Sequence, residues 1–187
     1  MRIPSVMLLG VASGLSVFGM AIVVPSMNSI AQEFNAEFAQ VQFIISAYLF
    51  GLGIAQPVSG FLTDRFGRRP VMLSGFALFS IASVFCLFAS NLNLLILARF
   101  CQALGVSVGT VVSRAILRDT RSDEKMTEAM SYIAAAMGVA PIIAPIIGGF
   151  LDSAFGFRSA FVVTAVMGFI VLFAMHWRLS ETLGERL

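Results

Sequence analysis

Charged residues are scarce in this chain. Asp, Glu, Lys and Arg make up 12% of its 187 residues, against roughly 25% in soluble domains, and the mean hydropathy is +0.93. A membrane span needs about 20 apolar residues, so the chain has room for about six. The composition excludes a water-soluble domain, and no Lys/Arg cluster outside the short loops is dense enough for nucleic-acid binding.

Residues for catalysis or metal binding are also few. Cys86 and Cys101 fall in apolar runs, and we interpret them as small hydrophobic residues rather than a disulfide framework. His176, the single histidine, is interpreted as an interfacial residue. Ser107 lies in a Gly-x-Ser-x-Gly string, but a nucleophile elbow needs a strand-to-helix turn. The sequence has no phosphate loop and no metal-ligand spacing, so we predict a protein that is not an enzyme and uses no cofactor.

Six apolar runs predict an all-α membrane protein with six transmembrane helices in one bundle, residues 1–187. The first run follows a single Arg2 and has no small-residue cleavage pattern, so we interpret it as a retained span. The runs cover residues 5–24, 39–62, 71–89, 94–117, 127–151 and 159–177.

Positive charges gather on one side of this topology. With both termini on the same side, that side holds nine Lys/Arg residues and the opposite side holds Arg158. Because short cytoplasmic loops carry the excess of Lys and Arg, we predict that both ends face the cytoplasm. The nine are Arg2, Arg65, Arg68, Arg69, Arg118, Arg121, Lys125, Arg178 and Arg186.

One charged turn interrupts the apolar runs at residues 60–70, which read Gly-Phe-Leu-Thr-Asp-Arg-Phe-Gly-Arg-Arg-Pro. Asp64 falls at the C-terminal end of a helix, where the macrodipole disfavours a negative charge. We therefore expect a partner for Asp64: Arg65, Arg68 or the N-terminus of an opposing helix. Gly67 can adopt the positive φ that a tight turn needs. The alternative is a solvated turn that only follows the positive-inside rule.

Residues 60–69 resemble residues 149–158. Six of the ten positions are identical, namely Gly, Phe, Leu, Phe, Gly and Arg. The first copy ends the second predicted span and the second copy ends the fifth, on opposite sides of the membrane. Two such copies are what an inverted repeat of three plus three helices would leave, so we predict that repeat.

Arg99 is a charge well inside an apolar run. Ionisable residues in spans are costly and usually face a bundle interior or an aqueous cavity. The alternative is a side chain that extends to the outer interface, about 8 Å away. Gln102 shares the face of Arg99. With the span residues Tyr48, Gln56 and Tyr132, these two form a candidate substrate and proton pathway.

The fifth apolar run combines two prolines with three glycines. Prolines four residues apart remove two backbone donors and bend a helix, and the glycines allow neighbouring helices to pack closely. The alternative is a kinked helix that only faces lipid. The residues are Gly138, Pro141, Pro145, Gly148 and Gly149.

Three motifs resemble the major facilitator superfamily. Residues 60–69 resemble its loop between the second and third spans. Arg99-x-x-Gln102-x-x-Gly105 resembles its fourth-span motif, whose arginine is implicated in proton coupling or substrate contact. The fifth-run pattern resembles its antiporter motif. With Arg118-Asp119 and Ser180-Glu-Thr-Leu183, these motifs resemble the Bcr/CflA type of drug:proton antiporters.

The resemblance implies the N-terminal half of an inner-membrane exporter that exchanges protons for small amphiphilic drugs by alternating access. Its partners would be the bilayer, the drug, protons and a missing C-terminal six-helix half. The alternative is a half-size protein that acts as a homodimer or as a non-transporting membrane subunit. The conformational switch loop would contain Gly60, Asp64, Arg65, Gly67, Arg68 and Arg69, with Asp119 as its partner.

One departure from the resemblance concerns the proton. Relatives commonly carry an Asp in the first span four residues before the proline, and here Ala21 precedes Pro25 at that position. No carboxylate remains deep in a predicted span, since Asp64 and Asp152 lie at the rims. Arginine does not readily titrate, so either the protein does not couple to protons or its titrating acid lies elsewhere, with the missing half as a candidate place.

Overall fold

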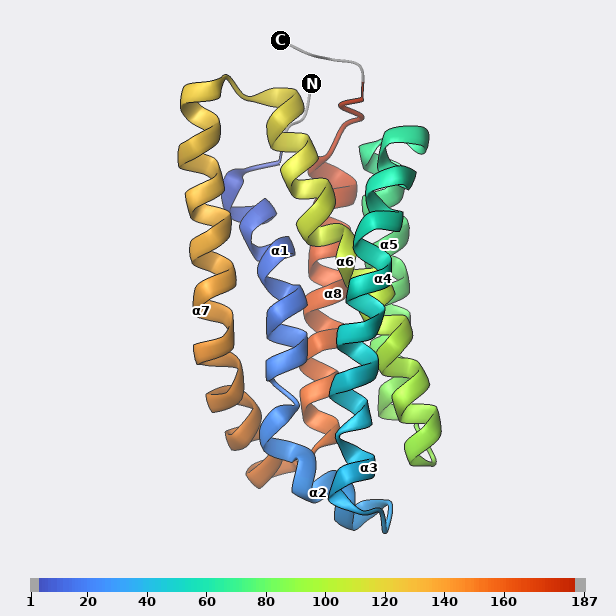
Figure 1. Cartoon of the computed structure of the whole chain (residues 1–187). Helices are drawn as coiled ribbons and strands as arrows, with labels where there is room; N and C mark the ends of the chain where they lie inside the picture. Colours follow the sequence, from blue (N-terminus) through green and yellow to red (C-terminus); the bar gives the residue numbers. More distant parts are fainter. Residues whose placement is uncertain (1–3, 184–187) are drawn as a thin grey trace.

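The structure, a computed structural model, describes residues 4–183, and the regular elements of that range, from Val6 to Arg178, are all helices (Figure 1). Six helical segments are long and apolar enough to cross a membrane, which confirms the predicted all-α membrane fold. Arg2 and Arg186 lie outside the described residues. The elements are α1 (Val6–Ala21), η1 (Val24–Ser26), α2 (Met27–Glu33), α3 (Phe38–Val41), α4 (Phe43–Phe66), α5 (Arg68–Leu87), α6 (Leu92–Thr120), α7 (Asp123–Phe155) and α8 (Arg158–Arg178).

Several helices extend past the apolar runs that predicted them. α4 continues to Phe66 and so includes Asp64 and Arg65, and α7 begins at Asp123 rather than at residue 127. The hydropathy of the sequence falls where charged residues begin, and this marked the predicted ends. The helices continue further because helical hydrogen bonds still satisfy the backbone groups beyond the apolar layer. The α-helix of the first span ends earlier than predicted, at Ala21, and the chain continues through η1 and α2.

Glycines set the closest helix contacts of the bundle. α1 packs mainly against α7 and α6, and α6 packs against α4 and α5. A Cβ on Gly148 of α7 would overlap the Ile22 carbonyl at the end of α1, and a Cβ on Gly109 of α6 would overlap the Ala12 carbonyl of α1. These small residues therefore let helix backbones approach one another directly.

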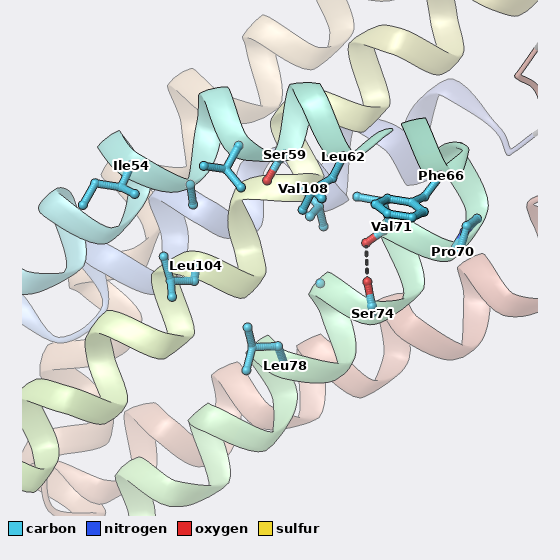
Figure 2. A pocket seen from close by; sticks show the side chains of 13 residues that line it. Ile54, Ser59, Leu62, Phe66, Pro70, Val71, Ser74, Leu78, Leu104 and Val108 are labelled. Carbon is cyan, nitrogen blue, oxygen red and sulfur yellow. Dashed lines mark hydrogen bonds between the residues drawn. The ribbon is translucent and has the colours of Figure 1, made fainter. Parts of the chain in front are cut away.

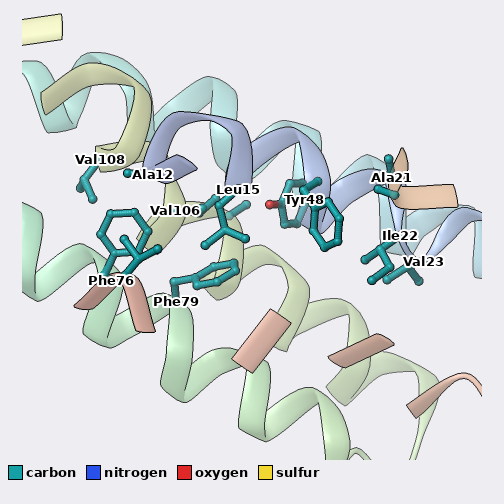
Figure 3. Close-up of a cluster of buried hydrophobic side chains, with 14 of the residues drawn as sticks. Ala12, Leu15, Ala21, Ile22, Val23, Tyr48, Phe76, Phe79, Val106 and Val108 are labelled. Carbon is teal, nitrogen blue, oxygen red and sulfur yellow. The ribbon is translucent and has the colours of Figure 1, made fainter. Parts of the chain in front are cut away.

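The core lies between α1, α5 and α6. Leu15 of α1 faces Phe76 and Phe79 of α5, with Val106 of α6 alongside (Figure 3). α4, α7 and α8 lie outside this core, and each exposes a row of large apolar side chains. Those of α4 include Phe43, Phe50 and Phe61, and those of α7 include Ile142, Ile146 and Phe150.

The inverted repeat is visible in the packing. Exchanging α1 with α6, α4 with α7 and α5 with α8 maps the α1–α7 contact onto the α6–α4 contact. Gly67 and Gly156 occupy equivalent places at the ends of α4 and α7, with φ of +99° and +80°. Arg69 donates to the His176 carbonyl near the end of α8, while Arg158 donates to the Leu87 carbonyl at the end of α5.

Gly148→Ala is expected to lower the melting temperature, because its Cβ would overlap the Ile22 carbonyl. Overpacking of this kind costs about 1–3 kcal/mol. Gly53→Ala is the matched control: nothing lies within 4 Å of its Cβ, and Ala is favoured over Gly inside a helix by about 1 kcal/mol. Size-exclusion chromatography after heating in detergent measures both, and equal melting of the two variants would contradict the close α1–α7 contact.

Candidate functional site

Arg99 of α6 is fully buried inside the bundle and does not extend to the membrane interface. Its Nη1 donates to the carbonyl oxygen of Gly19 in α1 at 2.9 Å and to Oε1 of Gln102 at 2.6 Å. Its guanidinium carbon lies 4.1 Å from the ring centroid of Tyr48 in α4. Three of the five predicted pathway residues, Tyr48, Arg99 and Gln102, therefore lie together.

Gln102 extends this cluster to two further helices. Its Nε2 donates to Ser83 Oγ of α5 at 2.6 Å and to Thr164 Oγ1 of α8 at 3.4 Å. The Tyr48 hydroxyl donates to the Ser16 carbonyl of α1 at 2.9 Å. The network, hereafter the Arg99 cluster, thus joins α1, α4, α5, α6 and α8 and leaves out α7.

The Arg99 cluster carries a positive charge that no carboxylate among the side chains described by the structure, those of residues 4–122 and 125–183, neutralises. Nε and Nη2 of Arg99 are buried and have no hydrogen-bond partner. The rings of Tyr48 and Phe161, the latter 5.9 Å away, face the guanidinium and offset part of the cost of burying it. An unpaired buried charge is otherwise expensive, so the site can attract an anionic group whenever a conformational change exposes it.

Arg68 links the switch loop to α6. Its Nη1 donates to Asp64 Oδ1 at 2.7 Å and to the Thr63 carbonyl at 2.8 Å, so Arg68 is the partner that Asp64 requires. Its Nε donates to Asp119 Oδ2 at 2.8 Å, and this second ion pair is almost fully buried. Gly67 has the positive φ predicted for the turn, +99°. The arrangement holds the ends of α4 and α6 together.

The remaining switch-loop residues have separate contacts. Arg69 anchors the start of α5 to α8 through the His176 carbonyl at 3.3 Å. Arg65 is exposed, with its guanidinium carbon 5.4 Å from the ring centroid of Phe66. Gly60 faces α6, where its Cβ would lie 3.9 Å from Val111. Only Arg68 therefore binds both acids of the predicted loop.

Glu181 is a member of this site that the sequence-based reasoning missed. Its carboxylate accepts hydrogen bonds from the backbone N–H groups of Arg68 at 2.8 Å and Arg69 at 3.2 Å, the first residues of α5. α5 has no side-chain cap of its own, so Glu181 satisfies the N–H groups at its start. Thr182 and Leu183 donate to the same carboxylate. The segment 180–183 carried this signal, but only as a mark of family resemblance.

The electrostatics of Glu181 follow from these donors. Burial alone would raise the pKa of this carboxyl, but the four backbone N–H groups outweigh burial and hold the pKa below its ordinary value. The ionised carboxylate is therefore the form that caps α5.

Other predicted residues lie away from the Arg99 cluster. Gln56 is exposed on α4, and Tyr132 is 60% exposed on α7. α7 runs through Pro141 and Pro145 without a break in the helix. Of the motif glycines, Gly148 and Gly149 contact the first span, at Ile22 and Pro25, whereas nothing lies within 4 Å of a Cβ on Gly138.

The count of positive charges in the sequence also left out Arg114. This residue is exposed on α6, one turn before the exposed Arg118. It adds to the positive charge at the end of the bundle that carries the switch loop, hereafter the basic end.

A helical bundle with an inverted repeat of membrane-length helices and a buried polar network is the architecture of a secondary transporter half. A sequence profile of the Major Facilitator Superfamily matches residues 9–186, and the chain belongs to that superfamily.

Relatives and a solved structure agree with this assignment. The multidrug resistance protein MdtL of Shigella dysenteriae is 37% identical over 164 residues, which cover 88% of this chain and 42% of MdtL. An uncharacterized transporter of Rickettsia bellii is 40% identical over 119 residues, 64% of this chain and 29% of that protein. The crystal structure of a D-xylose-proton symporter superposes with a TM-score of 0.82 at 16% identity, over 95% of this chain and 48% of the symporter. The chain therefore has the fold of one half of a major facilitator transporter and spans less than half the length of these relatives.

Glu181→Gln is expected to destabilise the protein by about 1 kcal/mol at neutral pH, as loss of a helix cap does, because an amide presents one acceptor oxygen instead of two. The folded-state pKa of Glu181 lies below the unfolded value of about 4.3. The stabilisation is thus complete above the unfolded pKa and is lost as the pH falls through the folded pKa.

Melting temperatures of wild type and variant across a pH series measure this effect. Their difference should be largest at neutral pH and should shrink in acid. Glu128→Gln, which alters an exposed carboxylate on α7, is the matched control. A difference for Glu181→Gln that does not change with pH would show that the carboxylate is not the cap.

Proposed function

We propose that this chain is the N-terminal half of a transporter that exports small amphiphilic drugs in exchange for protons, by alternating access and without a cofactor. The observation that carries the proposal is the Arg99 cluster, an uncompensated charge at the meeting point of five helices. A charge so placed costs stability and is characteristic of a substrate or ion pathway. The similarity to MdtL, a multidrug resistance protein, supports drugs as the substrate class.

A second six-helix half would complete the transporter. The exposed apolar faces of α4 and α7 are available for it, and the relatives are more than twice as long as this chain. Two copies of this chain, or a non-transporting subunit, would use the same faces. An N-terminal tag at the native locus separates these arrangements. A membrane product about twice the 20.1 kDa of this chain supports the first, and one of 20.1 kDa overturns it.

The proton-carrying acid is proposed to lie in that second half. Within the described helices, Asp64 and Asp152 lie at the ends and Asp119 is paired with Arg68. An acid brought close to Arg99 would have a lowered pKa and release its proton, and separation from Arg99 would allow it to bind a proton again. Drug and proton could then alternate in one site.

The proposed membrane is the inner, or plasma, membrane, with both ends of the chain in the cytoplasm. Support comes from the concentration of arginines at the basic end, since cytoplasmic loops carry the excess positive charge. The switch loop then lies on the cytoplasmic side. There the Arg68 contacts to Asp64 and Asp119 would hold one conformation and break in the other.

Arg99→Met is expected to abolish drug export and leave membrane insertion intact. Because no described carboxylate pairs with Arg99, an apolar side chain of similar length leaves no buried counter-charge behind, so the variant should fold. Efflux of a fluorescent amphiphilic dye from cells that express the complete gene measures export. Arg118→Met, at an exposed arginine of the same helix, is the matched control and should export normally. Unchanged export by Arg99→Met would refute the proposed role.

Asp64→Asn is expected to slow turnover up to about fivefold, since an exposed ion pair contributes about 1 kcal/mol or less. The apparent affinity for drug should not change, because the Asp64–Arg68 pair belongs to the switch loop and makes no contact with the Arg99 cluster. Initial efflux rates in proteoliposomes at varied drug concentration separate the two parameters. A change confined to KM would contradict a conformational role.

A further inference from the structure

A long apolar groove lies between α4 and α5, with α6 as its floor (Figure 2). Its volume is about 610 Å³. The α4 wall runs from Ile54 to Phe66, and the α5 wall runs from Pro70 to Leu78. Ile54, Val58 and Phe66 of the α4 wall and Leu78 of the α5 wall are exposed, so the groove opens on the apolar surface of the bundle.

The groove has the length of one membrane leaflet. The α4 wall from Ile54 to Phe66 spans about 18 Å along the helix, and half of a bilayer core measures about 15 Å. Phe66 and Pro70 flank the switch loop, so the groove begins at the basic end and reaches the middle of the bundle.

The groove offers few hydrogen-bonding groups to an occupant, because its two serine hydroxyls are already bonded within the protein. Ser74 Oγ donates to the Val71 carbonyl at 3.1 Å, the dashed line in Figure 2. Ser59 Oγ is bonded to Ser107 Oγ of α6 at 2.9 Å. The other lining side chains are apolar or glycine. A drug with polar groups would leave them unsatisfied here, whereas a hydrocarbon chain has none to satisfy.

A cation stands at the mouth of the groove. Arg65 is exposed, and its guanidinium lies beside the ring of Phe66, which lines the groove. Arg68 is committed to Asp64 and Asp119, and Arg69 to the α8 carbonyl. Among the described residues at this mouth, Arg65 is the arginine without a hydrogen-bond or carboxylate partner.

We propose that this groove binds one acyl chain of an anionic glycerophospholipid, with the headgroup phosphate on Arg65. Apolar walls of leaflet length account for the chain, and the unpaired arginine at the mouth accounts for the headgroup. A bound lipid would brace the ends of α4 and α5, which the switch loop joins. The inference does not depend on drug export.

Native mass spectrometry of the purified membrane protein tests the proposal, with dioleoyl phosphatidylglycerol and dioleoyl phosphatidylcholine supplied at equal mole fraction. We expect the wild type to retain phosphatidylglycerol about fivefold over phosphatidylcholine, the effect of one arginine near the lipid surface. Val58→Trp, which fills the groove from the α4 wall, should lose the retained lipid. Arg65→Gln should retain a lipid but no longer discriminate between the headgroups.

Two variants outside the groove are matched controls. Leu49→Trp places the same bulk at an exposed position of α4, and Arg118→Gln removes an exposed arginine at the basic end. Both should behave as wild type. If Val58→Trp does not fold, Leu78→Trp fills the groove from the α5 wall.

Three outcomes would overturn the proposal. Lipid retention unaffected by either groove-filling variant would place the lipid elsewhere. Headgroup discrimination that survives Arg65→Gln would remove Arg65 from the site. Displacement of the lipid by an amphiphilic dye such as ethidium, in the wild type but not in the groove-filling variant, would assign the groove to substrate instead.

Discussion

The buried guanidinium of Arg99 is the constraint on which the interior of this bundle depends. A membrane supplies no water to a buried charge, so every group that stabilises it must come from a neighbouring helix. Gly19 of α1 accepts from Arg99 through its carbonyl, and its missing side chain leaves room for Tyr48, whose hydroxyl would lie 3.0 Å from a Cβ there. Gln102 bridges to α5 and α8. Five helices are thereby positioned around one charge, and α7, which makes no contact with it, packs through glycine instead.

Comparison of the two copies of the repeated segment distinguishes two roles among the residues of the switch loop. Positions shared by both copies end one helix and anchor another. Gly67 and Gly156 end α4 and α7. Arg69 donates to a carbonyl near the end of α8, and Arg158 donates to a carbonyl at the end of α5. The Asp64–Arg68–Asp119 contacts have no counterpart in the second copy, which has Ser153 and Phe157 at those places. The repeat therefore explains the shape of the loop. The charges found in only one copy require a separate explanation, which the proposed conformational switching would provide.

The sequence predicted most of the fold because membrane helices are specified by local composition. Six apolar runs, the repeated segment and a buried Arg99 all follow from what a bilayer tolerates. It did not predict contacts that depend on which face of a helix packs inward. Gln56 lies eight residues from Tyr48, about 80° around α4, and that rotation takes it off the face buried against α6. Glu181 is more than 100 residues from the N–H groups it caps, and no local pattern encodes that distance.

The buried charge also constrains the rest of the proposed transporter. The helix that would carry the proton acid in relatives has Ala21 at that position, and the described carboxylates of this bundle lie near helix ends or in loops. A cation without its acid cannot couple proton movement to drug movement by itself, because arginine stays protonated at every physiological pH. In the proposed transporter, the coupling acid would reach Arg99 from outside these helices, across the faces where α4 and α7 expose their apolar side chains. Closing that interface would bring the acid close to the arginine, and opening it would separate them. Proton binding by the acid would then depend on which side of the membrane the site faces.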